Sequence, residues 1–183
     1  MNRETPYTIE EHRHRFAAWA AGRAASVRGS RFKVEVGKEI LESSGVEEVG
    51  RDIENLPKPA EFDAKHREWR ASVIQAAQER QLTFTHGVAA KLINVYFKSI
   101  FVCGQQHDDP RVRAIHPPID SLLLDALYSG NVGDLRDEWQ TARKARWSRF
   151  TSDQYEHLIE CIRAVVPENV GLWSIEEHWR GYQ

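Results

Sequence analysis

Apolar side chains recur at helical spacing along most of this 183-residue chain. Such spacing places them on one face of a helix, whereas strict alternation with polar residues marks a half-buried strand. Brief alternation occurs in residues 31–36, which fit either a short strand or the start of a helix. With 41% hydrophobic and 28% charged residues, a chain of this length can bury a core as one domain. The sequence therefore predicts an all-α fold, a compact orthogonal helical domain over residues 1–183.

Residues that start or stop helices give the bounds of the expected elements. Thr8, and Thr151 or Ser152, are suited to capping helix N-termini, and Gly29 is suited to ending the first helix. Helices are expected over residues 9–27, 33–42, 63–80, 88–103, 120–128, 135–146, 152–165 and 175–179. Proline-containing connecting loops are expected over residues 43–63, which are acidic and have room for one helical turn, and over residues 104–118, which are polar.

Large apolar residues at helical positions give the expected core. The first helix carries an apolar stripe made up of Phe16, Trp19, Ala20, Ala24 and Val27. The chain has six Trp, and those that fall at helical spacing, and are expected to pack in the core, are Trp19, Trp69 and Trp139.

Charge is nearly balanced overall but unevenly distributed along the chain. Twenty-five Lys and Arg against 27 Asp and Glu give a net charge of −2, which excludes a protein that coats nucleic acid through bulk charge. Residues 12–33 and 143–149 are locally basic, whereas residues 39–63 are acidic. Each basic segment is either a solvated helix face or a surface for phosphate groups. The sequence therefore still permits a local, salt-sensitive DNA interface.

Two cysteines, Cys103 and Cys161, are too few for a disulfide framework, a four-cysteine metal site or an iron–sulfur cluster. A reducing, cytoplasmic location is therefore expected. The first 16 residues show no apolar segment of a signal peptide, and no run of 18 apolar residues indicates a membrane span. Residues 103–116 contain Cys, His and Asp, but their spacing fits no standard zinc site, so no metal and no cofactor is expected.

The stretch from Phe84 to Leu127 contains two short motifs in a fixed order. The first consists of Gly87, Val88, Lys91, Asn94 and Val95, and the second of Pro118, Ile119 and Asp120. Over about 45 residues this arrangement resembles the helix-hairpin-helix DNA glycosylase superfamily, which includes the 8-oxoguanine glycosylases and the endonuclease III-like enzymes. The resemblance implies a helix-hairpin-helix-like motif within the helical domain and a DNA partner.

The resemblance also implies roles for particular residues. Lys91, expected in the first turn of its helix, would attack C1′ of a flipped nucleotide, and Asp120 would assist as the acid/base partner. Backbone groups at the hairpin would contact a DNA phosphate, and the residues concerned are His86, Gly87, Val88 and Ala89. The basic residues expected to grip phosphates are Arg143, Lys144 and Arg146. One aromatic residue among Tyr128, Trp139 and Trp147 is expected to stack on the extruded base. The predicted function is thus a DNA glycosylase/AP lyase.

Other interpretations remain open from the sequence. His86 stands where the family has proline and Ala89 where it has a second glycine, so the hairpin is altered. Lys91 also fits an ordinary helix lysine, and Asp120 an ordinary N-cap. The chain is then a non-catalytic module that binds nucleic acid or a partner protein, or an α-helical protein whose match to the family is accidental. The sequence predicts neither the base recognised nor the oligomeric state.

Overall fold

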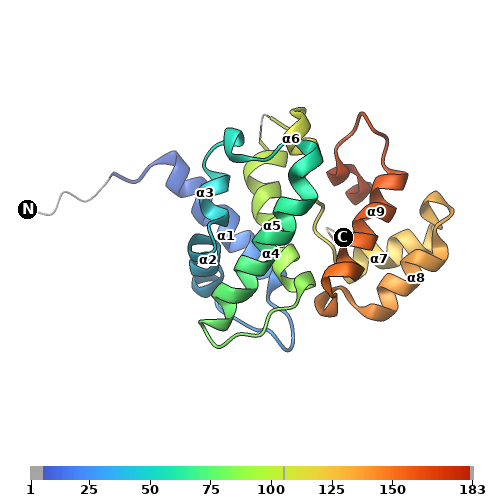
Figure 1. Ribbon diagram of the computed structural model, residues 1–183, viewed down its shortest axis with the longest axis horizontal. Coiled ribbons are helices and arrows are strands. Elements are labelled where there is room, and N and C mark those ends of the chain that lie inside the picture. The colour runs from blue at the N-terminus through green and yellow to red at the C-terminus, as the bar shows by residue number, and fades with distance from the viewer. Residues whose placement is uncertain (1–5, 105, 182–183) are drawn as a thin grey trace, which may run out of the picture.

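Figure 1 shows the computed structural model of the protein, in which residues 6–104 and 106–181 are described. Within these ranges the regular secondary structure is helical, and an isolated bridge between Val27 and Ser30 forms no strand. The predicted all-α class is confirmed, whereas the helix-hairpin-helix motif is not. The predicted domain over 1–183 also includes residues 1–5, 105, 182 and 183, which lie outside the described residues. Among the described helices, none combines the length and the apolar character needed to cross a bilayer.

The first helix, α1 (Ile9–Ala25), begins where the sequence predicts. The Thr8 hydroxyl oxygen accepts a hydrogen bond from the Glu11 N–H at 3.2 Å and so caps the helix. The chain leaves the helix at Ser26 and turns through Gly29, whose φ of 101° is readily adopted by glycine.

The face of α1 that packs inward differs from the predicted one. Phe16 and Trp19 are 59% and 52% exposed, so the apolar stripe through them is not the buried face and Trp19 is not in the core. The small residues Ala17, Ala18 and Ala21 are buried instead, where α1 packs on α2 and α5. Small side chains let helices approach closely, and that preference outweighs the burial of the larger rings here.

The acidic segment 43–63 is more structured than the predicted loop. After α2 (Val34–Ser43) it contains α3 (Val46–Gly50) and the short 3-10 helices η1 (Ile53–Asn55) and η2 (Pro59–Glu61). Val46 and Leu56 are buried, which anchors this segment on the helical core while its acidic residues face outward or pair with Arg side chains.

Two long helices, α4 (Phe62–Gln78) and α5 (His86–Phe97), lie side by side at the centre of the molecule (Figure 1). A π-helical segment, η3 (Lys98–Val102), continues α5. Trp69 of α4 is buried, as predicted. Most side chains of α5 are buried around its whole circumference, because α1, α4, α9 and residues 147–150 surround it.

The predicted loop 104–118 is only partly a solvated loop. It includes the short helix α6 (Pro110–Arg113), and residues 115–119 are buried. The following helix, α7 (Ser121–Ser129), starts directly after Asp120, its N-cap. The extended backbone imposed by Pro117 and Pro118 therefore runs through the interior and leads to Asp120.

The C-terminal third forms a second group of helices, on the right in Figure 1. Its elements are η4 (Val132–Asp134), α8 (Arg136–Ala145), η5 (Trp147–Arg149), α9 (Ser152–Val165) and η6 (Leu172–His178). Thr151 and Gln154 form a capping box at the start of α9. Trp139 of α8 is fully buried, as predicted, and its indole N–H donates to the Val132 carbonyl oxygen at 2.8 Å.

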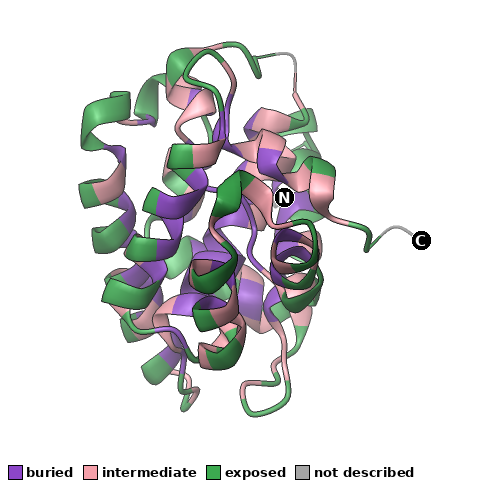
Figure 2. Ribbon diagram, turned by 90° about the vertical axis from the view of Figure 1, so that its right-hand side faces the viewer, coloured by how far each residue is buried: buried purple, intermediate pink, exposed green. Residues whose placement is uncertain are grey.

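The buried apolar residues form two clusters that meet at α5. One cluster lies among α1 to α6, and the other among α7, α8, α9 and η6. Figure 2 views the molecule from the side of the second group and shows buried residues on the inward faces of these helices. Ala90 belongs to the second cluster, and Trp147 packs against both. Lys91 therefore lies at the junction of the two clusters.

Candidate active site

Lys91 and Asp120, predicted as a catalytic pair, lie in direct contact. The Lys91 Nζ atom is 3.0 Å from Asp120 Oδ2, although the two residues belong to α5 and to the N-terminus of α7. The Lys91 side chain is 6% exposed and the Asp120 side chain 21%. A buried amine beside a partly exposed carboxylate is an arrangement suited to proton exchange and nucleophilic attack.

Burial sets the electrostatics of Lys91. Removal from water lowers the pKa of the Lys91 amine from its ordinary value, while the negative charge of Asp120 opposes the shift. The helix starts at His86, so Lys91 lies in the second turn rather than in the predicted first turn. The helix dipole acts mainly within the first turn, so burial is the dominant influence on this amine.

The two carboxylate oxygens of Asp120 accept hydrogen bonds from different parts of the structure. Oδ1 accepts a hydrogen bond from the Leu123 N–H at 2.9 Å and caps α7. Oδ2 accepts from the Lys91 amine and, at 3.0 Å, from the indole N–H of Trp179. The N-cap role and the pairing with Lys91 therefore coexist in one side chain, and Trp179 contributes to holding Oδ2 in place.

The segment that holds Asp120 is fixed by a buried polar network. Asn94 on α5, one turn after Lys91, donates through Nδ2 to the Pro117 carbonyl oxygen and to the Tyr155 hydroxyl, both at 2.9 Å. Its Oδ1 accepts from His66 Nε2 at 2.8 Å. Burial lowers the pKa of His66 well below its ordinary value, so this imidazole is neutral. Asn94, which belongs to the predicted motif, thus positions the chain leading to Asp120.

An aromatic residue from the second helix group completes one side of the site. The Lys91 Nζ atom lies 5.4 Å from the centre of the Trp147 ring. Trp147 follows Arg146, whose φ of 64° is unusual for a residue with a side chain. Of the residues predicted to stack on a base, Trp147 is thus next to the pair. Trp139 is fully buried, and the Tyr128 ring is covered by Arg143, 4.4 Å from its centre.

A second pair of opposite charges, not predicted from the sequence, lies beside the first. Lys98 forms an ion pair with Glu176 of η6, and the Lys98 Nζ atom is 5.9 Å from the centre of the Trp179 ring. Burial raises the pKa of Glu176, with Lys98 opposing the shift. Glu176 Oε1 is buried without a hydrogen-bond partner among the described residues. The site thus holds a carboxylate that is easier to protonate than an ordinary glutamate. One feature of the sequence points to this second pair. Lys91 and Lys98 are seven residues apart, which is about two helical turns, so a helix places them on the same face.

The first turn of α5 is not the open phosphate-binding turn that the resemblance implied. Gly87, Val88 and Ala89 are buried. The N–H of Val88 donates to the Thr85 hydroxyl oxygen at 3.2 Å, and that of Ala89 to the Thr85 carbonyl oxygen at 3.0 Å. His86 is partly exposed, and burial lowers the pKa of its imidazole.

Residues 147–150 cover this turn. The Thr85 hydroxyl donates to the Ser148 carbonyl oxygen at 2.9 Å. A methyl group built on Gly87 would lie 1.7 Å from the Trp147 carbonyl oxygen. Gly87 therefore permits the close approach of the segment that carries Trp147.

The predicted basic residues lie at the end of α8 and in the turn after it. Arg143 is paired with Asp125, whereas Lys144 and Arg146 are exposed, as is Arg149 further along. Because Trp147 contacts Lys91, this turn is adjacent to the Lys91–Asp120 pair.

Comparisons with protein-family models, with curated proteins and with solved structures found no match to this chain. The functional inference therefore depends on the residues themselves and on their geometry.

Proposed function

We propose that the protein is a DNA base-excision enzyme, a glycosylase/AP lyase that acts on a flipped modified base. Lys91 is the nucleophile and Asp120 its acid/base partner. The observation that carries the proposal is the 3.0 Å contact between the buried Lys91 amine and the Asp120 carboxylate. The sequence motifs pair these two residues independently of their positions in space, and an accidental match gives no reason for them to meet.

The proposed chemistry follows from the two groups. After Lys91 passes a proton to Asp120, the neutral amine attacks C1′ and forms a C–N bond as the glycosidic bond breaks. The electron pair of that bond leaves with the base, which receives the proton through Asp120. The secondary ammonium then loses one proton to Asp120, which is ionised again. Opening of the C1′–O4′ bond, with protonation of O4′ by solvent, leaves a protonated Schiff base between Lys91 and the sugar. No oxidant or reductant is needed.

The surroundings of the pair support a nucleic-acid substrate. Lys144, Arg146 and Arg149 are exposed next to Trp147, so positive charge is available for phosphates near the amine. Trp147 offers a flat ring beside the attacking nitrogen, suited to stacking on an extruded base. The acidic residues of segment 43–63 belong to the other helix group, so a net charge of −2 does not oppose a local interface.

The test is borohydride trapping. The protein is mixed with duplexes that carry an abasic site or one of a panel of modified bases, and borohydride is added to reduce any Schiff base. We expect a stable covalent adduct with at least one duplex. Lys91→Gln is expected to reduce the adduct at least 100-fold, because the nucleophilic nitrogen is removed.

Lys65→Gln is the matched control for the loss of one lysine. Lys65 is exposed on α4 and forms an ion pair with Glu68, one turn away, so this variant is expected to retain the adduct. Circular dichroism shows whether both variants fold. Absence of an adduct across the panel, or an adduct of unchanged yield in Lys91→Gln, would contradict the proposal.

A second candidate is a non-catalytic module that binds nucleic acid. This candidate is favoured by the structural roles of Lys91 and Asp120, since Asp120 caps α7 and its hydrogen bond to Lys91 joins α5 to α7. In that case Lys91→Ala leaves DNA binding intact, whereas Lys144→Glu weakens it. The slope of the logarithm of the DNA-binding constant against the logarithm of the salt concentration then becomes shallower by about one or more. Arg28→Glu, an exposed change in the other basic segment, is the matched control.

A further inference from the structure

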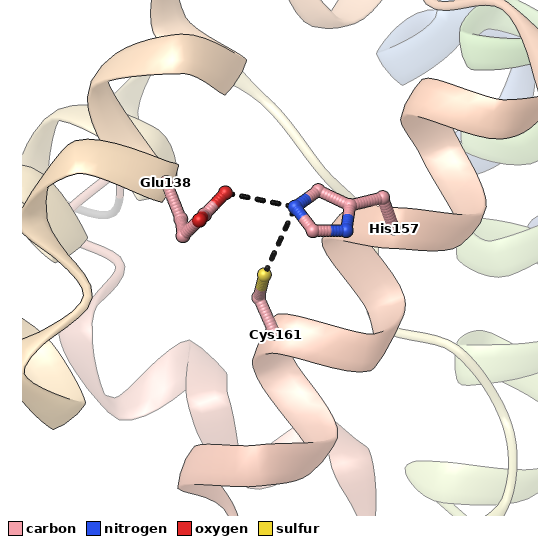
Figure 3. Close-up of side chains that lie close together, drawn as sticks. All are labelled: Glu138, His157 and Cys161. Atoms are coloured by element: carbon pink, nitrogen blue, oxygen red, sulfur yellow. Dashed lines mark hydrogen bonds and ion pairs between the residues drawn. The ribbon is translucent and has the colours of Figure 1, made fainter.

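Side chains of three residue types that can bind metals converge between α8 and α9 (Figure 3). Glu138 comes from the first turn of α8, and His157 and Cys161 lie one turn apart on α9. His157 Nε2 is 2.8 Å from Glu138 Oε2 and 3.7 Å from Cys161 Sγ. Each side chain offers one donor atom, and these atoms all lie within 4.8 Å of one another. The cluster is separate from Lys91 and Asp120.

The two donor distances that involve His157 Nε2 can be compared with those around a tetrahedral ion, and the Glu138 and Cys161 donors lie within 4.8 Å of each other. Zinc–nitrogen and zinc–oxygen bonds of about 2.0 Å and zinc–sulfur bonds of about 2.3 Å place sulfur about 3.5 Å from the nitrogen and oxygen about 3.3 Å from it. The observed Sγ–Nε2 distance of 3.7 Å already fits. The Glu138–His157 contact, now a hydrogen bond, has to open by about half an ångström for the ion to replace the shared proton.

The helix framework holds the three residues at this spacing. Trp139, next to Glu138, is fully buried and bonded to the Val132 carbonyl, which fixes the start of α8. Leu158 and Ile162 anchor α9 in the second core cluster. The His157 side chain is exposed and that of Glu138 is partly exposed, so both can adjust to a ligand with little strain.

The donor types and the open space favour a transition metal over Ca²⁺ or Mg²⁺. A thiolate and an imidazole are ligands for Zn²⁺ and related ions, whereas Ca²⁺ and Mg²⁺ prefer oxygen. Cys161 is buried, which shields its sulfur from competing reactions. A hollow of about 50 Å³, lined in part by Gln154, His157 and Cys161, adjoins the donors and leaves room for a water molecule as the fourth ligand.

We propose that Glu138, His157 and Cys161 bind a divalent transition-metal ion of the Zn²⁺ class, with water in the fourth position. The ion joins α8 to α9, the two helices on either side of the turn that carries Arg146, Trp147 and Arg149. It therefore stabilises the exposed basic turn beside the Lys91 site without taking part in the chemistry there.

Titration with Co²⁺, which adopts zinc geometry and has visible absorption, tests the site. We expect saturable 1:1 binding, with d–d bands in the visible and a thiolate-to-cobalt charge-transfer band in the near ultraviolet. Zn²⁺ should displace Co²⁺ and abolish both. Cys161→Ser should remove the charge-transfer band, and Glu138→Gln, a change of similar size at a partly exposed side chain, should weaken binding at least tenfold.

Cys103→Ser is the matched control, because Cys103 is the exposed cysteine outside the cluster. This variant should keep the full spectrum and affinity. Absence of saturable 1:1 binding, survival of the charge-transfer band in Cys161→Ser, or its loss in Cys103→Ser would each overturn the proposal. A Zn²⁺-dependent rise in Tm that disappears in His157→Gln would support it independently.

Discussion

The Lys91 amine lies 3.0 Å from Oδ2 of Asp120, across 29 residues of sequence, while Oδ1 of the same carboxylate caps α7. One side chain therefore serves both the stability of a helix and the pairing of the buried amine. The two oxygens are distinct, so substitutions can separate the two contributions. This separation gives the first prediction.

Asp120→Asn and Asp120→Ala should differ in stability but not in chemistry. Asparagine keeps a carbonyl oxygen for the Leu123 N–H, whereas alanine loses the cap at a further cost of about 1 kcal/mol. Neither variant accepts the proton of Lys91, so both should reduce trapping by at least tenfold. Urea unfolding and trapping rates measure the two effects. Equal stability of the two variants, or undiminished trapping in Asp120→Asn, would be inconsistent with the divided role.

Gly87→Ala should destabilise the fold by about 2 kcal/mol or more, because its new methyl group would meet the Trp147 carbonyl oxygen at 1.7 Å. Gly22→Ala is the matched control. It is also a glycine within a helix, but its methyl group would lie 3.4 Å from Val34, an ordinary contact. This control should be neutral or stabilising by up to about 1 kcal/mol. Thermal unfolding compares them, and a neutral Gly87→Ala would show that residues 147–150 do not pack as described.

Asn94→Leu should cost about 3 kcal/mol, because it leaves the Pro117 carbonyl oxygen and the His66 imidazole buried without partners. The exposed change Asn55→Leu, which also removes a bond to a backbone carbonyl, should cost less than about 1 kcal/mol. Asn94 acts as a positioning residue, so trapping at Lys91 should also slow in the fraction that is folded. A stable Asn94→Leu variant with normal trapping would remove Asn94 from this role.

Stability should fall as the pH drops below about 6.5, the ordinary pKa of histidine. Burial lowers the pKa of His66 and of His116 in the folded protein, so the unfolded chain binds protons that the folded chain does not. Each imidazole then contributes a slope of up to about 1.4 kcal/mol per pH unit. Urea unfolding at several pH values should show this slope. The slope should be smaller in His66→Gln, and an unchanged slope in that variant would contradict the assignment.

Much of the helical pattern follows from local signals. The caps Thr8 and Thr151 and the apolar periodicity suffice to place α1 and α9, and Trp69 and Trp139 are buried as predicted. Trp19 is exposed instead. The face of α1 that packs inward depends on how closely α5 and α2 approach it, and the periodicity of apolar residues does not predict that distance. Segment 43–63 contains more helix than the single turn that local signals allow, since its short helices depend on tertiary contacts of Val46 and Leu56.

The site shows the same limit. The motifs singled out Lys91 and Asp120, but their contact with Trp147 and the pair Lys98–Glu176 depends on how the C-terminal helices fold back onto α5. The burial of Gly87 under residues 147–150 is likewise a long-range effect. Similarly, His157 and Cys161 stand four residues apart, a visible signal, but the packing of α8 on α9 brings Glu138 to them.

Mapping of the borohydride-reduced adduct by peptide mass spectrometry tests the proposed enzyme most directly. If Lys91 is the nucleophile, the sugar remnant should be found on the peptide that contains Lys91, and on no other lysine at comparable yield. An adduct carried mainly by Lys98, by a surface lysine or by the N-terminal amine would contradict the assignment of Lys91.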